Sequence, residues 1–266
     1  MNEYFIIPYN GGKMPSKFTS SFGKFYREST ENFFLIYYVI ALDVNSDDKV
    51  KENSLNELIE DMRQHTTEEI FNHVKEGLIK EVGLALFNSD MYERILCQMS
   101  FTRVVDNFLC YIKDVLSEII KVYPDILKSK DTEKLEDILQ FDEMVDLREF
   151  IIEKKIKELF YKNIDDIKKF FLDRLNLDLF QDKASYIDTI VKQRNLIIHN
   201  RGIVSSEFNK HYPDYKIGIQ IYFDYADIDK VILEVGNIVT DIDIMIAQKY
   251  TKLKLTKNSL PTSGKN

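Results

Sequence analysis

One stretch of the chain restricts the possible folds more than any other: residues 90–122 form a single helical pattern. Apolar side chains recur there at intervals of three and four residues, and no proline occurs before Pro124. An α-helix presents such positions on one face, and Ser89 or Asp90 is suited to cap its first turn. The predicted apolar stripe comprises Ile95, Met99, Val105, Phe108, Ile112, Val115, Leu116 and Ile119.

The composition also favours helices. The 266 residues include only 9 glycines and 5 prolines, and 44% are hydrophobic, so helix breakers are scarce and a core can form. Residues 31–42 are apolar on every side, which fits a buried helix or a buried strand. Thr66 and Glu69 have the spacing of a capping box and open a predicted helix to about Phe87. Further helices are predicted at 132–140, 143–161, 164–175, 184–200 and 226–250.

The segment 216–224 departs from the helical period. Its isoleucines and Phe223 alternate with glycine, glutamine and tyrosine, which is the two-residue period of a strand. The predicted fold class is therefore mainly all-α: a helical bundle with a short β element before the last helix.

Three parts follow from these patterns. Residues 1–89 are expected to form a helical or irregular N-terminal extension, 90–252 the helical domain and 253–266 a polar tail. Prolines and glycines concentrate in residues 1–30, which predicts irregular structure there. The only charges between Glu3 and Glu28 are basic, and aromatic residues alternate with them. This stretch either contacts RNA or a partner, or is a solvated arm packed by its own aromatic side chains.

The net charge of −8 and the pI of about 5.2 exclude a protein that coats duplexes non-specifically, because such binding needs many cations. Any contact with nucleic acid must use a local patch. No apolar run is long enough to span a bilayer, and the N-terminus lacks the pattern of a signal peptide. We therefore expect a cytoplasmic protein with no membrane contact.

Neither a cofactor nor a metal is predicted. Gly11, Gly12 and Lys13 lack the spacing of a phosphate-binding loop. His65 and His73 lack a third ligand at metal-binding spacing. The two cysteines, Cys97 and Cys110, lie within a helical pattern without a nearby partner, so they are interpreted as reduced core residues.

The most informative segment runs from Tyr186 to Val204, YIDTIVKQRNLIIHNRGIV. On a helix, Tyr186, Ile187, Ile190, Val191, Ile197 and Ile198 form one apolar stripe, and Arg194 falls near its middle. Because an unpaired buried charge is costly, the guanidinium must reach a carboxylate, a subunit interface or an anionic ligand. Carboxylates that could pair with it are those of Asp106, Glu143 and Asp146.

His199 follows Arg194 by five residues, about 140° around an ideal helix. The two side chains can converge if the helix loosens near its end, if the long arginine wraps round the helix, or if a two-fold partner contributes its own copies. Gly202 is the predicted C′ residue of the helix, which places His199 in the last turn. The helix dipole there favours the imidazolium form.

The motif RNLIIHN resembles the signature of the HEPN family, an arginine, usually a polar residue, and a histidine after four to six intervening residues. The following Gly-Ile-Val step is similar to the exit from this helix in bacterial members. The resemblance covers roughly residues 90–250 and implies a helical bundle that dimerises, so that two motifs share one cleft. Many members cut RNA without a metal.

The resemblance also implies roles for individual residues. Arg194 would hold the scissile phosphate, His199 would transfer the proton, and Asn195 would orient His199 or a phosphate oxygen. Asp106 is the nearest match to an acidic residue that some members carry on the first core helix. Arg201 is either a second phosphate contact or a partner of the helix dipole. Arg201 also stands where some HEPN toxins carry a tyrosine that a nucleotidyltransferase modifies, which argues against that form of regulation.

Two functions from different classes follow. The first is a metal-independent endoribonuclease, a toxin or anti-phage defence effector that cuts RNA as a homodimer under the control of an antitoxin or defence-system partner. The second is a non-catalytic HEPN module that dimerises, binds RNA or a nucleotide, or docks a partner protein. A third and weaker option is one subunit of a larger complex with catalysis elsewhere.

Overall fold

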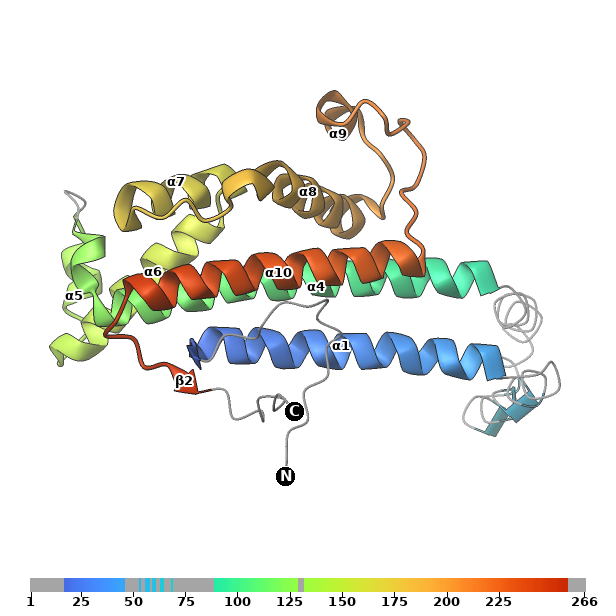
Figure 1. Ribbon diagram of the computed structural model, residues 1–266, viewed down its shortest axis with the longest axis horizontal. Helices are drawn as coiled ribbons and strands as arrows, with labels where there is room; N and C mark the ends of the chain where they lie inside the picture. The colour runs from blue at the N-terminus through green and yellow to red at the C-terminus, as the bar shows by residue number, and fades with distance from the viewer. Residues whose placement is uncertain are drawn as a thin grey trace, which may run out of the picture.

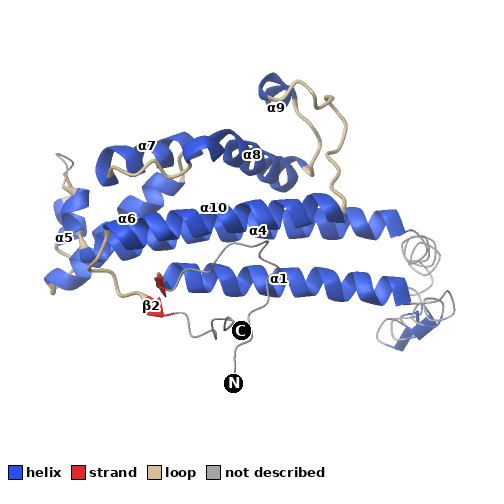
Figure 2. Cartoon of the chain, in the orientation of Figure 1, coloured by secondary structure: helices blue, strands red, loops and turns tan. Residues whose placement is uncertain are grey.

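The computed structural model describes residues 17–45, 89–128 and 132–257, together with isolated helical positions between 53 and 68. Three long helices lie side by side in it: α1 (Ser20–Asn45), α4 (Ser89–Val122) and α10 (Tyr225–Lys249) (Figure 1). Helices dominate the described chain (Figure 2), so the predicted mainly all-α fold is confirmed.

The shorter elements complete the fold. They are β1 (Lys17–Phe18), the 3-10 turns η1 (Pro124–Leu127) and η2 (Gln181–Lys183), α5 (Leu135–Ile138), α6 (Met144–Phe160), α7 (Ile164–Leu175), α8 (Ala184–Asn200), α9 (Ser206–His211) and β2 (Thr256–Lys257). Figure 1 shows α7 and α8 on the side of α4 and α10 opposite to α1. The predicted helices at 143–161, 164–175, 184–200 and 226–250 agree with α6, α7, α8 and α10.

Helix α4 forms the centre of the core. Val105, Phe108 and Ile112 are fully buried along its length, as their spacing predicts. Ile95 and Met99, which belong to the same predicted stripe, are exposed instead, Met99 to 64%. The stripe is therefore buried only from Val105, in about the fifth turn of α4, onward.

Helix α1 corrects the expectation that residues 1–30 are irregular, because Ser20 to Thr30 are helical. Phe22, Phe25 and Tyr26 recur at helical spacing and join the same core as α4 and α10. These three aromatic side chains are therefore neither exposed to a partner nor part of a solvated arm, because they are buried in the core shared with α4 and α10. Residues 31–42, which fitted a helix or a strand, are helical. The predicted helix at 66–87 falls outside the described residues, except for Glu68, and His65 and His73 fall outside them as well.

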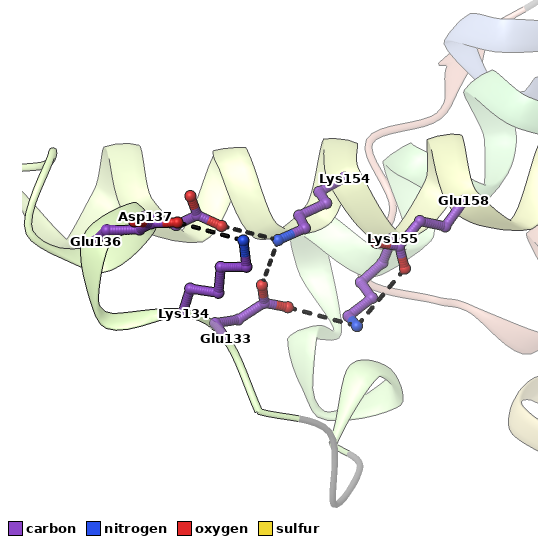
Figure 3. Close-up of polar contacts among 7 residues, drawn as sticks. All are labelled: Glu133, Lys134, Glu136, Asp137, Lys154, Lys155 and Glu158. Atoms are coloured by element: carbon purple, nitrogen blue, oxygen red, sulfur yellow. Dashed lines mark hydrogen bonds and ion pairs between the residues drawn. The ribbon is translucent and has the colours of Figure 1, made fainter.

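The predicted helix at 132–140 is reduced to the single turn of α5. Leu135 and Leu139 remain exposed, so no apolar stripe is buried that would favour a longer helix. Charged side chains hold this turn against α6 instead (Figure 3). Lys154 Nζ lies 2.7 Å from a Glu133 carboxylate oxygen and 3.0 Å from Asp137 Oδ2, and these hydrogen bonds raise the pKa of Lys154.

The predicted strand at 216–224 is wrong. Its residues contribute only an isolated bridge between Ile203 and Gln220, supported by a 2.9 Å hydrogen bond from the Val204 amide to the Ile219 carbonyl. Gly218 has φ +80°, a left-handed conformation that interrupts extended backbone. Outside this region, β1 pairs with β2, which begins just after the buried Leu253.

Cys97 is buried and Cys110 is exposed, and neither forms a disulfide. The expectation of a core position is therefore confirmed for Cys97 and wrong for Cys110, which faces outward from α4. Burial raises the pKa of the Cys97 thiol to about 12. In the part of the chain that the structure describes, no helix has the length and apolarity needed to cross a membrane.

Candidate functional site

Helix α8 carries the candidate site and packs on α4. Its buried residues are Ile187, Ile190, Gln193 and Leu196, so the buried face is rotated from the predicted stripe. Ile198, a member of that predicted stripe, is 44% exposed. Arg194 therefore lies at the edge of the buried face, with 23% of its side chain exposed, and not at its middle. This position places the guanidinium between the core and solvent.

The partner of Arg194 is Asp106 on α4. Arg194 Nε and Nη2 lie 2.7 Å and 2.6 Å from Asp106 Oδ1, so two nitrogens share one carboxylate oxygen. Of the three carboxylates proposed as partners, Glu143 and Asp146 form no hydrogen bond or ion pair with Arg194 within the described ranges. The side chain of Asp106 is 41% exposed, which leaves its carboxylate open to solvent.

Asn195 connects this ion pair to the exposed face of α8. Arg194 Nη1 donates a 3.0 Å hydrogen bond to Asn195 Oδ1, so the guanidinium reaches sideways round the helix. Asn195 and His199 are four residues apart and project from the same face. Among the described residues Arg194 and His199 form no direct contact; the arginine side chain reaches Asn195, four residues before His199. We call Asp106, Arg194, Asn195 and His199 the α8 cluster.

His199 lies in the last turn of α8, as predicted. Its side chain is exposed, and it forms no hydrogen bond or ion pair with residues 17–45, 89–128 or 132–257. Both ring nitrogens are therefore free to meet a ligand. The α8 cluster thus combines an oriented cation, an amide and an uncommitted imidazole.

The chain leaves α8 through two left-handed residues. Arg201 has φ +55° and Gly202 has φ +75°, and the Gly202 amide donates a 3.0 Å hydrogen bond to the Leu196 carbonyl. Arg201 is the C-cap residue, so Gly202 occupies the C′ position that was predicted for it. Gln220 Nε2 donates to the Arg201 carbonyl at 2.7 Å and fixes the backbone there. The Arg201 side chain is exposed and makes no hydrogen bond or ion pair in the described part of the chain.

A second polar group lies nearer the N-terminal end of α8, and sequence reasoning missed it. Asp188 Oδ2 accepts hydrogen bonds from Lys192 Nζ at 2.9 Å and from the Tyr212 hydroxyl at 2.8 Å. Lys192 Nζ also lies 5.5 Å from the centre of the Tyr212 ring. The hydrogen bond with Asp188 raises the pKa of Lys192. The available sequence signal was the four-residue spacing of Lys192 from Asp188.

His211 ends α9 and is exposed. The structure places it beside Asp188, Lys192 and Tyr212, where it lines a shared hollow, and gives it no contact with Arg194. This hollow is on the exposed side of α8, next to the α8 cluster.

No protein-family model, curated protein or solved structure matches the chain. Across the described ranges, no three histidine, cysteine or acidic side chains are arranged to hold a metal ion.

Proposed function

We propose that the protein is a metal-independent endoribonuclease whose active centre is the α8 cluster. The observation that carries this proposal is the contact of the Arg194 guanidinium with both Asp106 and Asn195, one helical turn before the uncommitted His199. This combination provides what phosphodiester cleavage requires: a positive group for the phosphate and a group that transfers protons near neutral pH.

In the proposed reaction, His199 accepts the proton of the ribose 2′-hydroxyl. The 2′-oxygen then forms a bond to the phosphorus while the bond from phosphorus to the 5′-oxygen breaks. The products are a 2′,3′-cyclic phosphate and a 5′-hydroxyl, whose proton comes from water or from His199 of the partner subunit. Arg194 stabilises the negative charge that grows on the phosphoryl oxygens. Asp106 acts as a positioning residue, because it holds the guanidinium by two nitrogens.

The proposed active form is a homodimer. Six exposed apolar side chains support this proposal, because they belong to segments near the C-terminal end of α8: Ile95, Met99, Ile198, Ile203, Ile217 and Ile219. Gln98 of α4 donates a 3.1 Å hydrogen bond to the Ile221 carbonyl, which brings the turn of Ile95 and Met99 to the loop that follows α9. Exposed apolar groups of this kind mark interaction surfaces. A two-fold axis near this end of α8 would bring two α8 clusters together.

The proposed biological role is that of a toxin or anti-phage defence effector that acts in the cytoplasm and is held inactive by an antitoxin or another defence protein. The net charge of −8 supports a narrow RNA-binding cleft over a broad basic surface. The affinity for RNA should therefore decrease only modestly as the salt concentration rises.

The Asp106 contact also favours one alternative, a non-catalytic HEPN module that binds RNA, a nucleotide or a protein partner. Two of the three guanidinium nitrogens already contact a carboxylate, which partly neutralises the charge available to a phosphate. In a purely structural role, this ion pair would hold α8 to α4 and His199 would be dispensable.

Cleavage of a mixed RNA pool in EDTA distinguishes the two functions. The wild-type protein should cut and leave 2′,3′-cyclic phosphate ends, and His199→Ala should cut about 10²–10⁴-fold more slowly. Lys162→Ala removes an exposed cation in the α6–α7 connection and serves as the matched control, with unchanged cleavage. Equal cutting by wild type and His199→Ala would refute the assignment. RNA binding without cleavage under activating conditions would favour the module.

A further inference from the structure

The hollow beside α8 has the dimensions and walls of a ligand pocket. It is open to solvent and has a volume of about 330 Å³, near the lower end of the range of small-molecule sites. Three separate elements form its walls: α7 contributes Asp165, α8 contributes Asp188 and Lys192, and the end of α9 contributes His211 and Tyr212. We call it the α8–α9 pocket.

The charges of this pocket are unsuited to a phosphate. The carboxylates of Asp165 and Asp188 outnumber Lys192 in the lining. The Lys192 ammonium donates one hydrogen bond to Asp188 at 2.9 Å and has two further N–H groups for a ligand. The carboxylate of Asp165 adds a further negative charge and accepts no hydrogen bond from the described part of the chain. A carboxylate is an acceptor only, so the pocket favours a neutral ligand that presents N–H donors.

The aromatic side chains of the pocket further restrict the class of ligand that can bind. Tyr212 is held in place by the hydrogen bond to Asp188 and by its ring contact with Phe208, whose centre lies 4.9 Å away. The imidazole of His211 adjoins it on the exposed side. A flat heterocycle fits against such side chains, because nucleobases stack on aromatic rings. A base that carries adjacent N–H donors on one edge and an acceptor beside them matches this lining best, and guanine is that base.

The pocket lies along the same face of α8 as the α8 cluster. Asp188, Lys192, Asn195 and His199 are spaced by four, three and four residues, so they follow one face of α8. Lys192 and His199 are separated by about 10 Å along the helix axis. A strand of RNA whose phosphate lies at Arg194 could therefore place a neighbouring base in the pocket.

We propose that the α8–α9 pocket binds guanine, with the Asp165 carboxylate accepting from N1–H and the N2 amino group, Lys192 donating to O6, and His211 and Tyr212 contacting the ring. The proposed binding is argued from the pocket alone and does not depend on the ribonuclease function. Its role as the subsite that selects a guanine beside the scissile phosphate rests on the proposed ribonuclease function.

Nucleotide binding tests the pocket separately from cleavage. The His199→Ala protein, which retains the full pocket, is titrated by NMR with the 5′-monophosphates of guanosine, adenosine, cytidine and uridine. Because all four carry the same phosphate, differences in affinity report the base. Guanosine monophosphate should bind at least about tenfold more tightly than the others. Equal affinities, or no binding, would overturn the proposal.

A pair of variants isolates the carboxylate. Asp165→Asn should reduce the affinity for guanosine monophosphate about tenfold, because an amide offers one acceptor and one mismatched donor. Asp166→Asn changes the adjacent carboxylate in the same first turn of α7, outside the pocket lining, and should leave the affinity unchanged. Equal losses in both variants would show a non-specific effect at the start of α7 and would contradict the proposal.

Mapping of cleavage sites then tests the role of the pocket. Wild-type protein should cut beside guanine, and Asp165→Asn should cut with the guanine preference reduced about tenfold while total cleavage persists. Cleavage without any guanine preference would refute the subsite. Selective binding of guanosine monophosphate by a protein that cuts no RNA would support the pocket and count against the ribonuclease.

Discussion

Two carboxylate-centred clusters in this molecule differ in how completely their polar groups are satisfied. In the core, Asp243 is fully buried and accepts hydrogen bonds from the Thr19 amide at 3.1 Å, the Thr19 hydroxyl at 2.5 Å and the Tyr111 hydroxyl at 3.2 Å. We call these three residues the Asp243 cluster. On the surface, the α8 cluster has a half-exposed carboxylate and the uncommitted His199.

The difference separates a structural role from the ligand-binding role that we propose for the α8 cluster. In the Asp243 cluster, both carboxylate oxygens are used within the protein, and the contacts hold the start of α1 against α4 and α10. In the α8 cluster, a ligand can reach donors and acceptors that the fold does not consume. Buried polar groups of the first kind contribute to stability and leave nothing for a substrate.

The largest effect on stability should come from the Asp243 cluster. Asp243→Ala removes the acceptor of three buried donors, so the free energy of unfolding should fall by about 2–4 kcal/mol. Denaturant unfolding followed by circular dichroism measures this loss. The RNA-cleaving activity of the remaining folded protein should be unchanged. A loss of activity at full stability would overturn the division between the two clusters.

The α8 cluster should respond in the opposite way. Asp106→Asn weakens the hold on Arg194, and cleavage should slow by about tenfold to 100-fold because the guanidinium is less well oriented. Stability should change by less than about 1 kcal/mol, since the ion pair is partly solvated. Kinetics and denaturant unfolding of the same sample check both values. A large loss of stability with normal cleavage would identify the ion pair as a structural contact.

These two clusters also show which structural features can be predicted from the sequence. The order of α4, α6, α7, α8 and α10 follows from local periodicity, which each helix must satisfy to bury a stripe. The pairing of Arg194 with Asp106 was one of three alternatives, because a helical pattern does not state which helix lies opposite. The contact between Thr19 and Asp243 joins residues 224 positions apart and has no local signal.

The errors have physical reasons of the same kind. Proline and glycine content suggested an irregular start, yet Phe22, Phe25 and Tyr26 gain enough burial to make Ser20 onward helical. The alternating residues of 216–224 resemble a strand, but the left-handed Gly218 leaves only one bridge. The α8–α9 pocket was missed because its walls come from three elements that meet only in the folded chain.

A substitution at the exit from α8 should reduce the stability by an intermediate amount. At Gly202, φ is +75° and an added Cβ would lie 3.3 Å from both the Gln220 and the Gln98 side chains. Gly202→Ala should therefore lower the free energy of unfolding by about 1–2 kcal/mol. Because the change also displaces the end of α8, cleavage should fall in parallel. Thermal unfolding and cleavage rates measure both, and an unchanged melting temperature would contradict this account of the turn.

The smallest predicted effect is the contribution of Asp243 to the pH dependence of stability. Burial raises the pKa of the Asp243 carboxyl above its unfolded value, so the folded protein binds the proton more tightly. The stabilisation from this group is therefore present at low pH and is lost as the pH rises through the raised pKa. Relative to Asp243→Asn, the wild type should gain stability as the pH falls from about 7 towards about 4. Unfolding curves across that range measure the difference, and a constant difference would refute the raised pKa.

The most direct test of the central claim is the cleavage rate of Arg194→Lys, measured together with its melting temperature. Lysine keeps the positive charge near Asp106 but cannot contact Asp106 and Asn195 with separate nitrogens of one planar group. We predict a loss of cleavage of at least about 100-fold with a melting temperature within about 3 °C of wild type. A lower melting temperature with unchanged cleavage would contradict the account and would make Arg194 a structural residue of the α4–α8 contact.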